Sequence, residues 1–321
     1  MPVALPAIDS PCFQPHPERK NPMNFMHDNK PFPIPVVAEL GIGTHQEDES
    51  LDYLSMPKDM ATYRAPVLPE PEEIAGHEPV KTVLKAVLAA LQQITTEGAA
   101  PEQTQRISLN GLAAADLTLV NQMLGEGEVS AQVRLEDEEP TVRIQESVFA
   151  GVWRVIETLD DGALRDCIEV GAVPAVLRDT SLEDGSAGVT VPLAPGLSPM
   201  GSNAPSVLFE LEDQRRRWQP SHAPHVVNLS LLPLTVDDIG YMDLRLGSGR
   251  VLILSRGYGN CRITNCCVPH TWRVVYYNSQ DTVILNAVEV TDMPDVACAA
   301  QEDLRDSMER LQEVIEWVDQ S

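Results

Sequence analysis

Several features that would assign the chain to a protein class are missing or scarce. No apolar run reaches the length of about eighteen residues that a transmembrane helix requires, so we expect no membrane span. Basic residues number 23 against 48 acidic ones, which gives a formal net charge of −25. Nucleic-acid binding needs a basic face that neutralises phosphates, so the charge argues against a nucleic-acid partner.

Cysteine is also scarce, with six residues in the chain of 321. The first residues, MPVALPAIDSPCFQPHPERK, contain prolines where a signal peptide needs a continuous apolar segment. We therefore expect a cytoplasmic chain, in which cysteines stay reduced unless they bind metal or take part in redox chemistry.

What the sequence does contain is a clear division into segments. Proline is concentrated before residue 72, which predicts a proline-rich, largely extended N-terminal arm over residues 1–75. A Gly/Ser/Pro-rich linker is expected over residues 179–206. Two apolar stripes at helical spacing predict amphipathic helices. The first comprises Val80, Val83, Leu84, Val87, Leu88, Leu91 and Ile94, and the second comprises Ala300, Leu304, Met308, Leu311, Ile315 and Val318.

An internal repeat spans the predicted linker. Residues 107–129, 142–157 and 167–177 align with 229–251, 261–276 and 287–297, so that Ile107 matches Leu229. Four pairs keep a nearly constant offset: Trp153/Trp272, Arg154/Arg273, Glu169/Glu289 and Pro174/Pro294. The expected fold class is α+β, with two related repeats over residues 76–178 and 207–321, each an antiparallel sheet with flanking helices. The second repeat is expected to include the C-terminal helix.

A cluster of three cysteines in the second repeat is the most unusual feature. Cys261, Cys266 and Cys267 lie close in sequence to His270. The repeat places Val142, Ser147, Val148 and Gly151 at the matching positions. The thiols are therefore either buried core residues, or sulfur ligands that the second copy has acquired. Their spacing matches none of the usual zinc signatures, and adjacent strand residues face opposite ways, so a buried core explains them more simply than a metal site.

The remaining candidate residues have structural explanations. The glycines of Gly257-Tyr258-Gly259 lie between two strands and favour a tight hairpin over a phosphate-binding loop. Asp237 and Asp238 lie at an expected helix start, where capping accounts for them. No set of nucleophile, base and orienting residue can be identified, so the sequence predicts no enzyme.

Three motifs carry a resemblance to a known family: RGYGNCR at residues 256–262, WRVVYYN at 272–278, and MPKDMATY at 56–63. With them, the chain from about Pro33 onward resembles the HupH/HoxQ/HyaF family of accessory proteins of nickel–iron hydrogenase expression and maturation. The resemblance implies a non-enzymatic chaperone without a resident cofactor, which binds the hydrogenase small-subunit precursor with its twin-arginine signal peptide before export. It also implies a thioredoxin-like hydrogenase accessory protein as a companion, and an iron–sulfur cluster at most in transit.

The residues expected to contact the partner lie in the arm and in the second repeat. They are Met56, Pro57, Lys58, Asp59, Met60, Tyr63, Arg256, Gly257, Tyr258, Gly259, Asn260, Cys261 and Arg262. Alternatively, the glycine-rich motif only shapes a hairpin and the arm only packs on the body. Two other functions stay open: an iron–sulfur carrier or scaffold that uses Cys261 and its neighbours, and a thiol–disulfide enzyme, which requires a lowered cysteine pKa.

Overall fold

The computed structural model describes residues 69, 71–74, 76–96, 104–134, 139–159, 161–187, 202–220, 222–257 and 259–319. Apart from residues 69 and 71–74, the predicted arm lies outside this part of the chain. The α-helices are α1 (Pro71–Ile74), α2 (Glu78–Ile94), α3 (Ala114–Leu124), α4 (Ala175–Ala187), α5 (Ala204–Arg217), α6 (Val236–Leu246) and α7 (Gln301–Asp319). Two short 3₁₀ helices are η1 (Leu229–Leu231) and η2 (Asp295–Ala297).

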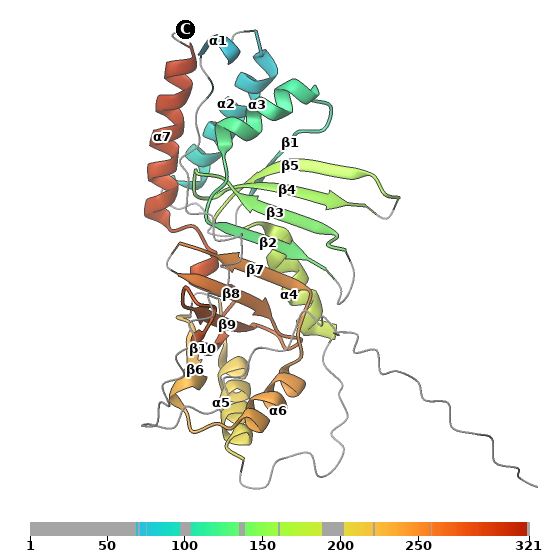
Figure 1. Cartoon of the computed structure of the whole chain (residues 1–321), viewed down its shortest axis with the longest axis vertical. Coiled ribbons are helices and arrows are strands. Elements are labelled where there is room, and N and C mark those ends of the chain that lie inside the picture. Colours follow the sequence, from blue (N-terminus) through green and yellow to red (C-terminus); the bar gives the residue numbers. More distant parts are fainter. Residues whose placement is uncertain are drawn as a thin grey trace, which may run out of the picture. The chain divides into compact units, whose positions relative to one another are not determined.

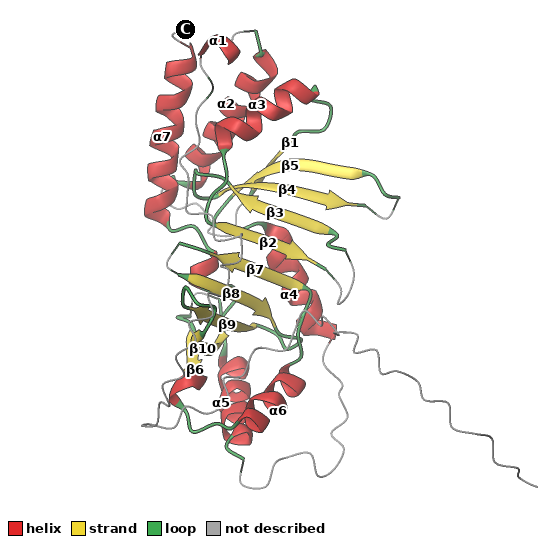
Figure 2. Ribbon diagram, in the orientation of Figure 1, coloured by secondary structure: helices red, strands yellow, loops and turns green. Residues whose placement is uncertain are grey.

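The strands form one antiparallel sheet of ten strands, so the predicted α+β class is confirmed (Figures 1 and 2). They are β1 (Gln105–Ser108), β2 (Val129–Val133), β3 (Val142–Glu146), β4 (Val152–Thr158), β5 (Leu164–Val170), β6 (His225–Asn228), β7 (Val251–Ser255), β8 (Asn260–Asn265), β9 (Thr271–Tyr277) and β10 (Val283–Val290). Their order is β1-β5-β4-β3-β2-β7-β8-β9-β10-β6. The two predicted sheets are therefore joined into one, because β2 pairs with β7.

The two halves of the sheet have the same strand order when each is read outward from the β2–β7 junction. Trp153 lies opposite Glu169 in the first half, and Trp272 lies opposite Glu289 in the second. Both positions therefore agree with the predicted repeat. The alignment needs one correction, because the registers match Ile107 with Val227 instead of Leu229. The connection between β6 and α6 is two residues longer than that between β1 and α3, which explains the shift.

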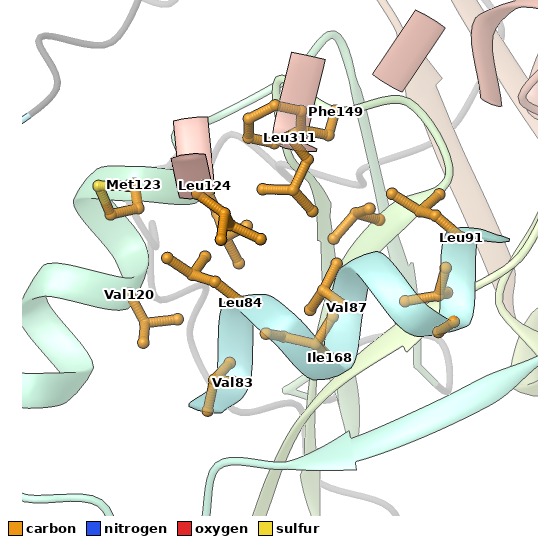
Figure 3. Packing of buried hydrophobic residues seen from close by; sticks show 14 of the residues in the cluster. Val83, Leu84, Val87, Leu91, Val120, Met123, Leu124, Phe149, Ile168 and Leu311 are labelled. Atoms are coloured by element: carbon orange, nitrogen blue, oxygen red, sulfur yellow. The ribbon is translucent and has the colours of Figure 1, made fainter. Parts of the chain in front are cut away.

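The first predicted helical stripe forms α2, and the second forms α7. The buried residues of α2 are Val80, Val83, Leu84, Val87, Ala90, Leu91 and Ile94, and those of α7 are Leu304, Ser307, Leu311, Ile315 and Val318. Both helices enter one core that also contains Phe149, Ile168 and residues of α3 (Figure 3). Thus α7 ends the second repeat in sequence but packs on the first repeat in space.

A central core lies on one face of the sheet, which we call face A, and extends across the β2–β7 junction. It contains Trp153 and Trp272 of equivalent strands, together with Leu177 of α4 and Ala297 of η2. The opposite face, face B, packs against α2, α3 and α7 in the first half and against α5 and α6 in the second. The central core therefore links the two halves.

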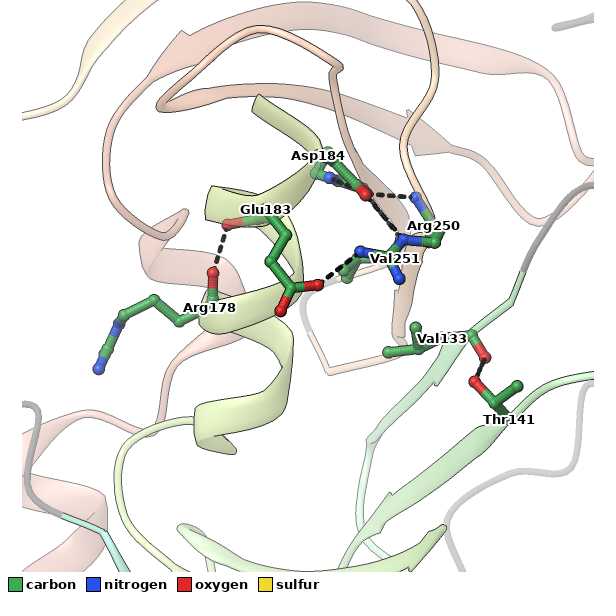
Figure 4. A network of polar contacts seen from close by, with 9 residues as sticks. Val133, Thr141, Arg178, Glu183, Asp184, Arg250 and Val251 are labelled. Carbon is green, nitrogen blue, oxygen red and sulfur yellow. Dashed lines mark hydrogen bonds and ion pairs between the residues drawn. The ribbon is translucent and has the colours of Figure 1, made fainter. Parts of the chain in front are cut away.

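Helix α4 continues to Ala187, well into the predicted linker, and α5 begins before its end. Asp184 accepts hydrogen bonds from the backbone N–H and Nε of Arg250, both at 2.7 Å, and Glu183 accepts one from the same side chain (Figure 4). A Cβ on Gly185 would lie 2.7 Å from Cα of Pro269, so glycine allows the helix to approach that loop. These contacts with the second half explain why a glycine- and serine-containing segment is helical.

Among the described helices, none combines the length and the apolar character needed to cross a bilayer.

Candidate partner-binding surface

The predicted contact region in the second repeat is an exposed hairpin bend between β7 and β8. Arg256, Gly257 and Gly259 are exposed, and Asn260 is half-buried at the start of β8. The backbone N–H of Arg256 donates to the carbonyl oxygen of Glu128 at 3.1 Å, which ties the bend to the first half of the sheet. The bend is therefore accessible and held at its base.

Its two described glycines have different requirements. Gly259 has φ of +108°, a conformation that residues with a Cβ adopt only with strain. A Cβ on Gly257 would collide with a carboxylate oxygen of Glu128, but that oxygen is the end of an exposed, flexible side chain. Gly259 is thus required by the backbone, whereas Gly257 leaves room for Glu128.

The two residues that follow on β8 point to opposite faces of the sheet. Cys261 is 3% exposed and belongs to the central core on face A. Burial raises the pKa of its thiol to about 12, so the thiol is protonated at neutral pH. Arg262 lies on face B, with its guanidinium 5.7 Å from the ring centre of Tyr277. Only Arg262 of this pair faces away from the central core.

The other members of the cysteine cluster lie in different surroundings. Cys266 is buried among the apolar residues of α5 and α6, and burial raises its pKa to about 12. Cys267 is half-buried, and burial raises its pKa too. His270 stacks on Trp218 with ring centres 3.6 Å apart, and burial lowers its pKa. His270 has φ of +52°, as Gly151 has +78° at the matching position, so the turn is the same in both copies.

The structure therefore does not gather the cysteine cluster into a metal-binding arrangement. Cys261 belongs to the core on face A, whereas Cys266 belongs to the core on face B. Within the described part of the chain, no group of three or more His, Cys, Asp or Glu side chains is placed to hold a metal ion. No described geometry favours ligation by these thiols.

Sequence reasoning named Arg262 but missed the other outward side chains of the four central strands on face B. They alternate with core residues, are half-buried or exposed, and include no carboxylate: Ser130, Gln132, Arg143, Gln145, Leu252, Leu254, Arg262 and Thr264. The patch contains two arginines, of which Arg143 pairs with Glu139 at 3.1 Å, and Leu252 and Leu254 make it partly apolar. The alternation of core and non-core residues along each strand is the signal that could have located it.

Part of the predicted contact set cannot be placed. Tyr258 of the bend and the arm residues Met56, Pro57, Lys58, Asp59, Met60 and Tyr63 lie outside the described residues. The predicted contribution of the arm to the partner contact therefore stays a prediction.

Comparison with known proteins places the chain in a family. The family model for the HupH hydrogenase expression protein, C-terminal conserved region, matches residues 80–190 and again residues 202–318. The two matches correspond to the two halves of the sheet and together span more than half of the chain.

Similarity to individual proteins extends over nearly their whole length. The chain is 53% identical to the hydrogenase expression/formation protein HoxQ of Cupriavidus necator, over 89% of this chain and 98% of that protein. It is 43% identical to HupH of Rhodobacter capsulatus, over 89% and 98%. It is 30% identical to the hydrogenase-1 operon protein HyaF of Escherichia coli, over 87% and 95%.

A solved structure of the hydrogenase expression protein HupH from Thiobacillus denitrificans matches 36% of this chain and 96% of its own, with 24% identity and a TM-score of 0.33. The two family-model matches and the nearly full-length relatives show, on sequence alone, that this chain belongs to the HupH family of hydrogenase expression proteins.

Proposed function

We propose that this protein is a cytoplasmic, non-enzymatic accessory protein of nickel–iron hydrogenase maturation. It acts as a chaperone that binds the immature small subunit, with its twin-arginine signal peptide, before export. The observation that carries the proposal is the family match across both halves, together with relatives named as hydrogenase expression/formation proteins. In this proposal a thioredoxin-like hydrogenase accessory protein is a companion in the same step.

The exposed bend supports a contact with a polypeptide. Arg256 and Gly259 face solvent, and the base of the bend is held by Glu128. An accessible bend on a rigid sheet suits protein–protein recognition, because little ordering entropy is lost on binding. The neighbouring polar and apolar patch on face B extends the proposed contact beyond the bend.

The net charge supports a role in attracting the signal peptide. A chain at −25 accelerates its encounter with a basic segment, and salt weakens that effect. Because the patch on face B contains arginines and no carboxylate, a twin-arginine segment is expected to bind at an acidic surface elsewhere on the molecule.

Co-purification tests the proposal directly. The tagged full-length protein is expected to capture the small-subunit precursor from cells that express both, and to capture less of a precursor without its signal peptide. Raising the salt concentration should reduce the captured amount of the full precursor more than that of the precursor without its signal peptide. An equal yield of both precursors at low and high salt would show that the signal peptide makes no contribution.

A further inference from the structure

The second half contains a cavity of about 310 Å³ between α5, α6 and the loop over residues 266–270. Its walls combine Leu208, Leu211, Leu246 and Val268 with the polar residues Glu212, Arg215, Arg245 and Thr271. We call this cavity the α5/α6 groove. The groove lies past the end of β8 that is opposite the hairpin bend. The groove and the bend are therefore separate features.

The first half shows what fills the equivalent place. Buried residues at the same spacing align α5 with α2, because Ala204, Val207 and Leu211 match Val80, Val83 and Val87. Each helix is also preceded by a hydrogen bond to an equivalent aspartate: His77 hydrogen-bonds Asp116 before α2, and Ser202 hydrogen-bonds Asp238 before α5. Six of the groove residues then match Leu84, Val87, Leu91, Met123, Leu124 and Phe149, and all six belong to the core that α7 covers.

In that core, Leu311 of α7 is completely buried and lies among the matching residues Leu84, Val87, Leu124 and Phe149 (Figure 3). The α5/α6 groove therefore corresponds to the place in the first half where a leucine from the covering helix α7 is buried.

The sequence differences between the halves leave room for an occupant. Val268 replaces the larger Phe149, whose side chain is 3% exposed in the first half. Phe209 on α5 is 76% exposed and matches Lys85, which holds Asp319 of α7 at 2.9 Å. A large apolar side chain is thus exposed on the path that a covering helix would follow.

The charges at the groove favour an acidic occupant. Arg215 matches Leu91 and Arg245 matches the buried Met123 of the first half. Arg215 pairs with Glu212, whereas Arg245 has no hydrogen-bond or ion-pair partner among the residues that the structure describes. A helix with a carboxylate beside its apolar stripe would pair with Arg245, and α7 itself has that composition.

We infer that the α5/α6 groove binds an amphipathic helix of a partner protein. The helix inserts a leucine-sized side chain between Leu208, Leu246 and Val268, places a carboxylate beside Arg245, and covers Phe209. The helix α7 of the same chain is already engaged in the first half. This site does not depend on the proposed role in hydrogenase maturation.

A peptide with the sequence of α7, residues 301–319, is a suitable probe because it fills the equivalent seat. Fluorescence anisotropy with the full-length protein should show saturable one-to-one binding. Val268→Phe, which copies the first half, should weaken it by about tenfold or more, because the seat for the leucine side chain is then filled. Arg245→Met, also copied from the first half, should reduce the salt dependence of binding. A peptide with Leu311→Ala should bind as weakly as the wild-type peptide binds to the Val268→Phe protein.

Lys85→Ala is the matched control, because it alters only the place where α7 is already docked. Its affinity for the peptide should equal that of the wild type. Absence of binding to the wild type, equal binding to Val268→Phe, or weakening by Lys85→Ala would each overturn the inference. A wild-type dimer that Val268→Phe converts to a monomer would overturn it too, since the groove would then bind a second copy.

Discussion

Ala131 and Ile253 lie directly opposite each other where β2 pairs with β7, and they are equivalent residues of the two halves. The backbone hydrogen bonds on either side of this pair also come in equivalent positions of the two halves. The N–H of Arg134 donates to the carbonyl of Arg250 at 3.0 Å, and the N–H of Arg256 donates to that of Glu128 at 3.1 Å. An approximate twofold axis therefore passes through this junction and relates the two halves as an antiparallel strand pair.

Removing the side chain at this axis should weaken both halves together. Ile253 is 1% exposed in the central core, so Ile253→Ala is expected to cost about 2–4 kcal/mol. Because that core spans the junction, hydrogen exchange should accelerate in β4 and β9 to a similar degree. Faster exchange confined to the second half would show that the halves unfold independently.

Burial of Glu146 predicts a pH dependence of stability. Its pKa is raised from the ordinary value of 4.5 to about 7, chiefly by desolvation, and its carboxylate accepts from the N–H of Gly151. The raised pKa means that the stabilising contribution of this group is complete below about pH 4.5 and is lost as the pH rises through 7.

The variant Glu146→Gln tests this, because the matching residue in the second half is the amide Asn265. The unfolding free energy of Glu146→Gln minus that of the wild type should increase by about 2 kcal/mol between pH 5 and pH 8. Urea unfolding at several pH values measures this difference. A constant difference across that range would mean that Glu146 does not titrate as described.

Alanine substitutions at two glycines with similar φ angles measure how much the contact between α7 and the first half contributes to stability. Gly151 and Gly162 have φ of +78° and +79°, so alanine strains both by about 1–2 kcal/mol. A Cβ on Gly151 would also collide with Leu304 of α7, whereas one on Gly162 meets open space. Gly151→Ala should therefore destabilise the protein clearly more than Gly162→Ala and expose α7 to proteolysis. Equal costs would mean that α7 adjusts without loss.

The buried thiols should be slow to react. At pH 8 an alkylating reagent, followed by mass spectrometry, should modify the half-buried Cys267 well before Cys261 or Cys266. Burial raises the pKa of both Cys261 and Cys266 to about 12 and keeps them as thiols. Rapid labelling of Cys261 in the folded protein would instead revive a redox or cluster-handling role for this residue.

Several features could be predicted from local sequence. The apolar stripes of α2 and α7 identify both helices, and the hairpin between β7 and β8 follows from the glycines between two strands. The expected capping role of Asp238 is confirmed, because it forms a capping box with Thr235. These features depend on neighbours in the chain, which the sequence displays.

Other features depend on contacts between distant segments. The junction of β2 with β7 results from the pairing of two edge strands, and neither strand shows its partner in its own sequence. The length of α4 depends on Asp184 and Gly185 meeting the second half. Similarly, the dispersal of Cys261 and Cys266 follows from the alternation of faces and the helices that cover each.

The most direct test of the account compares two equivalent arginines in co-purification of the small-subunit precursor. Arg256 lies in the bend, and Arg134 occupies the matching position in the first half. If the second copy's bend contacts the precursor, Arg256→Glu should lower the captured amount several-fold at unchanged protein stability, and Arg134→Glu should leave it unaltered. Equal capture by both variants and the wild type would contradict the assignment of the bend as the contact surface.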